Sequence, residues 1–304
     1  MELIRGTAEF RLEKCCAVAI GKFDGIHRGH QELLKNIREK KKEGLLAAVF
    51  TFDPPPAVFF GSGVYQGLTT REEKRRIFKK TGVDILIEFP LNEKSAAMEP
   101  EAFIREILAD KMQAAYVVAG MDVTFGNRGT GNSQMLVQYG KKLGFTVDII
   151  DKICLDGEEI SSSRIRAEVE RGNMEQVSAL IGFPYSITGT VVHGRRLGRT
   201  IGMPTVNLLP PSDKLLPPKG VYYSYVSYGG MHYKSITNIG KKPTVSQDGV
   251  MGVETFLYDF DEDIYGREIT VNLLKYKRPE MKFDSVESLA AQMQKDIREG
   301  KLYL

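Results

Sequence analysis

Several features that would narrow the function of this chain are scarce in its sequence or missing from it. Only three cysteines occur among 304 residues, and their spacing supplies neither a disulfide framework nor a zinc site. We therefore expect reduced, packed thiols at Cys15, Cys16 and Cys154. The longest apolar run, around Leu45 to Phe50, falls far short of the about 20 residues that a membrane-spanning helix requires.

An excess of charge of one sign is also missing. The chain has 42 Lys and Arg residues against 39 Asp and Glu residues, a balance that does not favour nucleic acid as a partner. Residues 1–14 mix charged with apolar side chains and lack the continuous apolar core of a secretory signal. We therefore expect a cytoplasmic protein without a membrane partner, and the sequence does not indicate an oligomeric state.

The composition and length that are present predict a globular protein of two domains. Hydrophobic residues make up 42% of the chain and charged residues 27%, and 304 residues exceed one ordinary core. Up to about residue 150, short apolar runs alternate with segments of helical periodicity, which predicts an α/β domain with a Rossmann-like, doubly wound parallel sheet. We expect five strands, at Cys16–Gly21, Leu45–Phe52, Val83–Phe89, Tyr116–Gly120 and Phe145–Ile150, and helices at Gln31–Lys42, Arg71–Lys80 and Pro100–Met112.

The second half of the chain has a different rhythm. Two short helices are expected at Ser162–Arg171 and Met174–Ile181, and Pro184 discourages helix beyond them. We place the boundary there, which gives domains 1–183 and 184–304. Short alternating runs separated by glycine-containing turns then predict a small antiparallel β-barrel, and an apolar stripe over Ser285–Glu299 predicts a C-terminal amphipathic helix.

The sharpest chemical signal is GKFDGIHRGH at residues 21–30, between the first predicted strand and helix. Ligands of open α/β sheets bind beyond the carboxyl ends of strands, and a helix N-terminus offers amides to phosphate. His27 and His30 are three residues apart, so both imidazoles can face one phosphate, which Gly29 lets approach closely. Two plainer interpretations stay open: local hydrogen bonds at a helix start, and zinc binding, for which further ligands are missing.

This segment resembles the HxGH signature of the nucleotidyltransferase superfamily and, over its full length, the GxFDGxHxGH form of prokaryotic FAD synthetases. The resemblance implies that the phosphate of FMN attacks the α-phosphate of ATP and that diphosphate leaves with the help of Mg²⁺. It assigns catalysis to His27 and His30. It assigns ATP or phosphate binding to Gly21, Phe23, Asp24, Gly25 and Gly29.

A second segment, ISSSRIR at residues 160–166, places hydroxyl and guanidinium groups at a predicted helix start. Such groups suit a leaving diphosphate. The segment resembles the ISSTxxR motif of the same family, which implies ATP or phosphate binding by Ser161, Ser162, Ser163 and Arg166. Taken alone, it is more typical of a helix N-cap with a solvated basic face.

The flavin side of the first domain is indicated by a loop after a strand. GMDVTFG at residues 120–126 resembles the GxDFxFG loop of the family, with Val123 in place of the usual phenylalanine. The resemblance implies flavin binding by Asp122 and Phe125. Thr51–Pro54 also ends its strand as the family does, although ordinary turn chemistry is the alternative for Asp53 and Asp122.

The C-terminal half carries a segment rich in glycine and arginine, GRRLGRTIGMPTVN at residues 194–207. Backbone amides near glycines can form an anion nest, and Thr205 and Asn207 offer neutral oxygens that suit Mg²⁺ already held by phosphates. The segment resembles riboflavin kinase, whose PTAN motif reads PTVN here. The resemblance implies Mg²⁺ binding by Thr205 and Asn207 and ATP binding by Gly194, Gly198, Arg199 and Gly202, and a flexible basic loop is the alternative.

A lone carboxylate, Glu254, stands in an apolar predicted strand, where it is costly unless it is paired or used. The matching position in riboflavin kinases carries the catalytic glutamate, so the resemblance makes Glu254 the base for the 5′-hydroxyl of riboflavin. Arg278, in a further matching segment, is a candidate flavin contact. Exposure to solvent is the alternative for both residues.

The motifs follow one another in family order across nearly the whole chain, which resembles the bifunctional riboflavin kinase/FAD synthetase (FMN adenylyltransferase) family. This implies ATP as co-substrate and riboflavin, FMN and FAD as substrates or products. One alternative keeps the adenylyltransferase but gives the barrel only a flavin- or RNA-binding regulatory role. Another is a nucleic-acid-binding protein that uses Arg195, Arg196 and Arg199.

Overall fold

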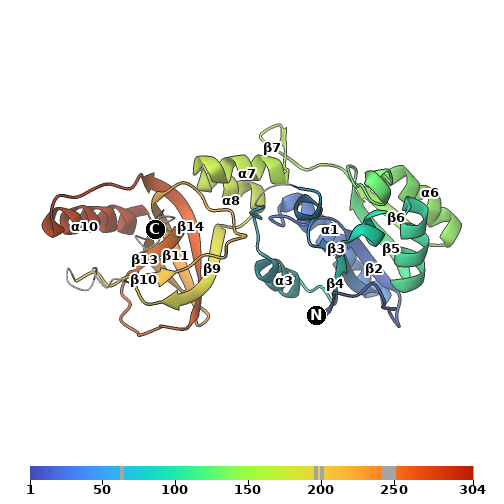
Figure 1. Cartoon of the computed structure of the whole chain (residues 1–304), viewed down its shortest axis with the longest axis horizontal. Helices are drawn as coiled ribbons and strands as arrows, with labels where there is room; N and C mark the ends of the chain where they lie inside the picture. The colour runs from blue at the N-terminus through green and yellow to red at the C-terminus, as the bar shows by residue number, and fades with distance from the viewer. Residues whose placement is uncertain (62–64, 195–197, 199–201, 242–250, 304) are drawn as a thin grey trace. The chain divides into compact units, whose positions relative to one another are not determined.

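The computed structural model describes residues 1–61, 65–194, 198, 202–241 and 251–303 of the chain (Figure 1). Contacts between Cα atoms divide the chain into two compact units, Met1–Ser162 and Ser163–Leu304, and each unit is described by itself. The domain boundary at residues 183 and 184 stays a prediction.

The first unit is built on a six-stranded sheet in which every strand pair is parallel. The order β1-β4-β3-β2-β5-β6 confirms the doubly wound α/β class, with the chain reversing its direction of winding at β2 and β5. The expectation of five strands was wrong, because β1 pairs with β4 at one edge. Its ends, Glu2 and Arg5, are exposed, and only two half-buried apolar residues lie between them. The strands are β1 (Glu2–Arg5), β2 (Cys16–Ile20), β3 (Leu46–Asp53), β4 (Ile85–Pro90), β5 (Ala114–Gly120) and β6 (Thr146–Ile150).

Alternate residues of β2 serve two separate cores, as expected for a sheet covered on both faces. Ala17 and Ala19 pack in one cluster with residues of α1 (Arg28–Glu39) and α3 (Arg71–Lys80). Val18 and Ile20 pack in the other cluster with residues of η2 (Phe103–Lys111) and α6 (Ser133–Leu143). Figure 1 shows these helices on both sides of the sheet.

Two helices differ from their predicted bounds. The helix expected from Gln31 begins at Arg28, after His27 takes an extended N-cap conformation, and ends in a 3₁₀ turn, η1 (Lys40–Glu43). The segment 100–112 begins as α5 (Pro100–Ala102) and continues as a π-helix, η2, a form that apolar periodicity does not distinguish. The remaining elements of this unit are α2 (Pro56–Phe59), α4 (Glu93–Ala96), η3 (Asn127–Gly129), β7 (Cys154–Leu155) and β8 (Glu158–Glu159).

The cysteines are free thiols, but only one of them is packed. Cys16, inside β2, is buried and its Sγ lies 3.2 Å from the carbonyl oxygen of Met112. Cys15 and Cys154 are exposed, so the expectation of packed thiols was wrong for these two. Cys15 precedes β2 and Cys154 lies in the two-residue strand β7, so neither belongs to a layer of the core.

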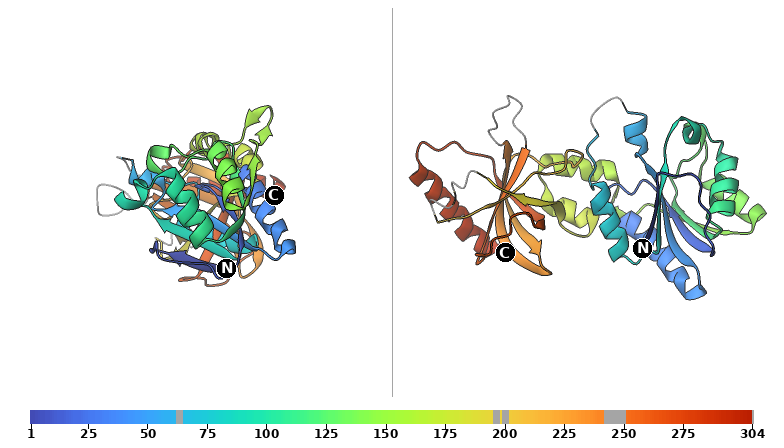
Figure 2. Two further views of the ribbon diagram at one scale, coloured as in Figure 1. Left: turned by 90° about the vertical axis from the view of Figure 1, so that its right-hand side faces the viewer. Right: turned by 60° about the horizontal axis from the view of Figure 1, so that its bottom comes forward.

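The second unit contains the expected antiparallel barrel, which closes in the order β10-β13-β12-β11-β14-β9. Its strands are β9 (Tyr185–Val192), β10 (Val206–Leu208), β11 (Gly220–Tyr228), β12 (Met231–Lys241), β13 (Met251–Leu257) and β14 (Glu268–Arg278). Two helices precede the barrel, α7 (Ser162–Arg171) and α8 (Met174–Ile181), with the bounds predicted from sequence. Figure 2 shows the C-terminal helix α10 (Val286–Tyr303) beside the barrel strands.

An ion pair and a close backbone approach are among the contacts that hold α10 on the barrel. Arg278, at the end of β14, forms an ion pair with Asp296, whose side chain is only 3% exposed. Gly300 lies directly on the barrel, since a Cβ there would be 2.5 Å from the hydroxyl of Tyr258. The helix therefore docks in part through a mostly buried charge pair and through a close backbone approach.

The barrel interior contains a chain of hydroxyl groups that crosses three strands. Ser224 on β11 lies 2.8 Å from the hydroxyls of both Ser235 and Thr237 on β12. Thr237 in turn lies 2.9 Å from the hydroxyl of Thr255 on β13. All four side chains are fully buried, and each hydroxyl can donate and accept a hydrogen bond at once.

Candidate functional site

The segment 21–30 forms a strained loop at the carboxyl end of β2, where the sheet changes its direction of winding. Phe23, Gly25 and Ile26 have φ angles of 50°, 81° and 41°, a region that side chains other than glycine rarely adopt. Strained backbone of this kind concentrates at functional sites. The loop leads into α1, and the side chain of the N-cap residue His27 makes no hydrogen bond to the helix. Amides at this helix start are therefore well placed for an anionic ligand.

The loop brings the two predicted catalytic histidines together. The rings of His27 and His30 stack with their centroids 3.8 Å apart, and Phe23 packs against His30 at 5.0 Å. Within the described part of the chain, the Nδ1 atoms of both histidines are buried and have no hydrogen-bond partner. Buried polar atoms are normally paired, so this pair of unpaired nitrogens indicates a place for a polar ligand.

Burial keeps both imidazoles neutral in the free protein. It lowers the pKa of His27 to about 4, against the opposite effects of the Asp24 and Asp122 carboxylates. It holds the pKa of His30 well below its usual range, with the charges of His27 and Lys74 acting in the same direction. At neutral pH each ring therefore has one N–H donor and one acceptor nitrogen.

Residues 67–70 form one wall of this site, although no local pattern in the sequence indicates it. Oδ1 of Asp24 accepts a hydrogen bond of 2.8 Å from the backbone N–H of Leu68. The backbone N–H of Gly25 donates to the hydroxyl of Thr69 at 3.2 Å. These bonds join segments 44 residues apart and hold the strained loop in place.

The helix that follows this wall, α3, carries a lysine toward the loop. Thr70 and Glu73 form a capping box that fixes the start of the helix. One turn later, Nζ of Lys74 lies 3.5 Å from the carbonyl oxygen of Lys22 in the loop. The capping-box pattern could have located the helix start in the sequence, but the contact of Lys74 with the loop has no local signal.

The structure places part of the serine and arginine motif at the same loop. Ser162 begins α7, and its hydroxyl donates a hydrogen bond of 2.9 Å to the carbonyl oxygen of Asp24. Ser161 is half-buried just before it. Ser163 and Arg166 follow in α7 and belong to the second compact unit. Their proposed contacts with phosphate stay predictions.

The predicted flavin loop follows β5, the neighbour of β2 in the sheet. Asp122 is exposed, and its charge acts on the pKa of His27, so the two side chains share one region. Phe125 is 3% exposed and packs against Phe103 at 5.2 Å. Its contacts are those of a core residue, and flavin binding by Asp122 or Phe125 stays a prediction. Asp53, at the end of β3, forms an ion pair with Arg71 rather than lying free.

The barrel brings three predicted kinase residues together where β10 pairs with β13. Asn207 on β10 lies directly opposite Glu254 on β13. The hydroxyl of Thr205 donates a short hydrogen bond of 2.5 Å to Oε1 of the exposed Glu254. Gly194 lies against Asn207, since a Cβ there would be 2.4 Å from Nδ2. Glu254 is thus exposed and accepts a hydrogen bond from a hydroxyl, and its role as a base stays a prediction.

The other predicted residues of the barrel have no described contact with Glu254. Gly198 and Gly202 are described, whereas Arg195, Arg196 and Arg199 lie outside the described residues. Arg278 is engaged with Asp296 and with the carbonyl oxygen of Pro279. In the structure Arg278 holds α10, and flavin binding by this residue stays a prediction.

A further carboxylate near Glu254 was missed by the sequence reasoning. Asn238 on β12 lies directly opposite Glu254, and its Nδ2 donates to Oε1 of Glu280 at 3.2 Å. Glu280 lies directly over Gly240. Asn238 is therefore the strand partner of Glu254 and also binds Glu280, an arrangement that depends on strand register and has no sequence signal.

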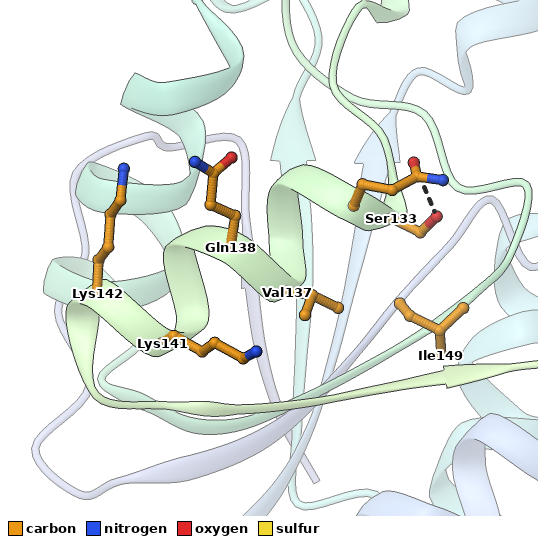
Figure 3. A pocket seen from close by; sticks show the side chains of 7 residues that line it. Ser133, Val137, Gln138, Lys141, Lys142 and Ile149 are labelled. Atoms are coloured by element: carbon orange, nitrogen blue, oxygen red, sulfur yellow. Dashed lines mark hydrogen bonds between the residues drawn. The ribbon is translucent and has the colours of Figure 1, made fainter.

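A surface pocket occurs elsewhere, between α6 and β6 (Figure 3). It is lined by Ser133, Gln134, Val137, Gln138, Lys141, Lys142 and Ile149, and none of the residues nominated by the motifs lines it. Among the described residues, no cluster of three or more His, Cys, Asp or Glu side chains could hold a metal ion. None of the helices in the described ranges combines the length and the apolar composition that a membrane span requires.

Comparisons with known proteins match both halves of the chain. The family model for FAD synthetase matches residues 10–164, and the model for riboflavin kinase matches residues 181–304. A bifunctional riboflavin kinase/FMN adenylyltransferase of Listeria monocytogenes is 36% identical over 94% of this chain and 91% of its own length. The Escherichia coli K12 protein of the same name is 35% identical over 97% of this chain and 96% of its own length.

A solved structure has the same architecture. A crystal structure from Streptococcus pneumoniae, described as a macrolide-efflux protein, superposes with a TM-score of 0.87 and 32% identity. The similarity covers 98% of both chains. A known protein is therefore similar in fold over nearly the whole length of this chain.

Proposed function

The chain belongs to the bifunctional riboflavin kinase/FMN adenylyltransferase family, and from that premise we propose that it makes FAD in two ATP-dependent steps. Riboflavin and ATP give FMN and ADP in the barrel, and FMN and ATP then give FAD and diphosphate in the α/β unit. The observation that carries this proposal is the consecutive match of the two family models, residues 10–164 and 181–304. We keep 1–183 and 184–304 as the proposed extents of the two domains.

In the kinase step, Glu254 acts as the base. The 5′-hydroxyl oxygen of riboflavin attacks the γ-phosphorus of ATP, the bond to the β,γ-bridging oxygen breaks, and the hydroxyl proton passes to the carboxylate. The exposure of Glu254 supports this role, because a ligand can reach the carboxylate. The hydrogen bond from Thr205 fixes the orientation of the carboxylate. Arg278 and residues of the glycine-rich segment, Gly194, Gly198, Arg199 and Gly202, are proposed to line the flavin and nucleotide sites.

The residues around Glu254 suit a magnesium ion. Thr205 and Asn207 supply a hydroxyl and an amide oxygen two positions apart along the chain, and Gly194 lies closely against the amide. Neutral oxygens of this kind suit Mg²⁺ that phosphates hold as well. When bound there, the ion would neutralise charge on the phosphates of ATP.

In the adenylyl transfer, an oxygen of the FMN phosphate attacks the α-phosphorus of ATP and diphosphate leaves. Little covalent help is required, so catalysis depends on positioning and on neutralising charge. His27 and His30 are proposed to donate hydrogen bonds to the phosphates from their N–H groups. The loop residues Gly21, Phe23, Asp24, Gly25 and Gly29 shape this site, Ser161, Ser162, Ser163 and Arg166 bind the departing diphosphate, and Asp122 and Phe125 face the flavin.

We also propose a cytoplasmic location, which the use of ATP in both steps supports. Nucleic acid has no part in this proposal. The alternative built on Arg195, Arg196 and Arg199 concerns residues outside the described part of the chain.

The test uses purified full-length protein with riboflavin, ATP and Mg²⁺, and separates FMN and FAD by chromatography over time. We expect His30→Ala to stop the reaction at FMN, because it removes one phosphate donor from the α/β unit. We expect Glu254→Ala to slow the formation of FMN on the order of 100-fold while supplied FMN is still converted to FAD. Loss of both activities in each folded variant would show that the two sites are not separate.

A further inference from the structure

A half-buried cation without an anionic partner lies beside the histidine loop. Lys74 belongs to α3, and its Nζ donates a long hydrogen bond of 3.5 Å to the carbonyl oxygen of Lys22. In the described part of the chain, no carboxylate oxygen lies within the 4.0 Å of an ion pair with this ammonium group. A buried charge is costly unless it is paired, so the position favours an anion that comes from outside the protein.

The three carboxylates whose charges act on the pKa of Lys74 all bind other groups. Asp53 pairs with Arg71, and Glu88 accepts two hydrogen bonds from Arg75. Oδ1 of Asp24 accepts the backbone N–H of Leu68. Burial lowers the pKa of Lys74, and these three carboxylates oppose that effect only from a distance. Their own contacts leave the amino group of Lys74 available to a ligand.

Packing aims Lys74 at the histidine pair. Phe78 lies four residues after Lys74, so the two side chains share one face of α3. Phe78 packs edge-on against Phe23 at 5.3 Å, and Phe23 packs against His30 at 5.0 Å. The face of α3 that carries Lys74 is thus fixed against the loop by a chain of aromatic contacts. The positive charge of Lys74 is also felt by His30, which places the two groups in one electrostatic neighbourhood.

The histidine pair needs such a charge, because both rings are neutral in the free protein. Two neutral imidazoles can donate hydrogen bonds to a triphosphate but cannot offset its negative charge. We propose that Lys74 binds the phosphate chain of the nucleotide beside His27 and His30 and neutralises charge that moves to the leaving diphosphate. This inference rests on the proposed adenylyl transfer and adds a residue to that site.

The experiment compares Lys74→Met, which keeps the length of the side chain without its charge, with Lys74→Arg, which keeps the charge. Lys80→Met is the matched control, because Lys80 is exposed at the end of the same helix. FMN is supplied directly, and the rates of FAD formation are measured against ATP concentration. The reverse reaction, from FAD and inorganic diphosphate, is measured against diphosphate concentration.

We expect Lys74→Met to lower kcat/KM for ATP on the order of 100-fold and to raise KM for diphosphate, the loss typical of one charge-stabilising group. Lys74→Arg should recover most of the rate, and Lys80→Met should stay within about twofold of the parent protein, as a surface change does. Riboflavin phosphorylation should be unchanged in all three variants. A rate of FAD formation in Lys74→Met within about twofold of the parent would overturn the inference.

A second measurement does not depend on activity. Removing the cation should raise the pKa of His30, because a like charge no longer opposes protonation, and the shift can be followed by NMR. An unchanged pKa in Lys74→Met would contradict the placement of Lys74. If the parent protein formed no FAD, the proposed function would be refuted. Binding of inorganic diphosphate to the parent and to Lys74→Met, measured by calorimetry, would then decide the role of Lys74: weaker binding by the variant would support the inference, and equal binding would overturn it.

Discussion

The buried imidazole of His27 should make the first unit of the protein less stable in mild acid. Because burial lowers the pKa of His27 to about 4 from 6.5, the unfolded chain takes up a proton in this range that the folded chain refuses. Stability from this residue is therefore fully present above pH 6.5 and is lost as the pH falls toward 4. The perturbation is a change of pH, compared between the parent protein and His27→Gln.

The magnitude follows from the size of the pKa change. One pKa unit corresponds to about 1.4 kcal/mol, so the full depression at His27 is worth about 3 kcal/mol. Carboxylates also titrate in this range, but they are common to both proteins and cancel in the difference. The pH-dependent part of the difference should therefore approach about 3 kcal/mol between about pH 7 and about pH 4.

The assay measures the free energy of unfolding by urea, followed through amide signals of the β2 strand so that the barrel does not contribute. The protein has only four histidines, so the ring signals of His27 can be assigned with the Gln variant and titrated by NMR. Parallel pH profiles of the two proteins, or a ring that titrates near its usual value, would refute the reasoning. His27 would then be open to solvent rather than buried.

Two further predictions concern the barrel. Gly194→Ala would place a Cβ 2.4 Å from Nδ2 of Asn207, so the amide must move, and we expect riboflavin phosphorylation to fall on the order of 100-fold with FMN adenylylation unchanged. Chromatography of FMN and FAD checks this, and equal rates of phosphorylation would show that the loop adapts. Asp296→Ala removes the partner of the mostly buried Arg278 and should lower the free energy of unfolding of the barrel by about 3 kcal/mol. Urea unfolding measures this, and a loss below about 1 kcal/mol would mean that the pair adds little to the docking of α10.

Local pattern in the sequence was sufficient for most elements and for the two histidines. The bounds of α3, α7 and α8 agree with the prediction, because caps and apolar periodicity mark them directly. The two histidines face one region because their spacing and the strand-to-helix position require it. Edge strand β1 escaped notice, since its exposed ends Glu2 and Arg5 leave no run of apolar residues.

Contacts between segments that are distant in the chain could not be predicted from the sequence. Nothing local indicates that Leu68 would bind Asp24 or that Lys74 would lie against Lys22, because each contact depends on how α3 packs on the sheet. The neutral state of the histidines has the same origin, since burial decides it. Arg278 shows the reverse case, in which a residue nominated for a ligand is engaged by Asp296, a partner that only the fold could reveal.

The hydroxyl chain inside the barrel determines which way Glu254 points. Thr255, the next residue, ends that chain at Thr237, and successive residues of a strand face opposite sides. If β13 slipped by one position, the hydrogen bond between Thr237 and Thr255 would break. The carboxylate of Glu254 would then face the interior of the barrel, at a cost of several kcal/mol. Four buried hydroxyl side chains thus set the strand register that keeps the carboxylate of Glu254 exposed to solvent.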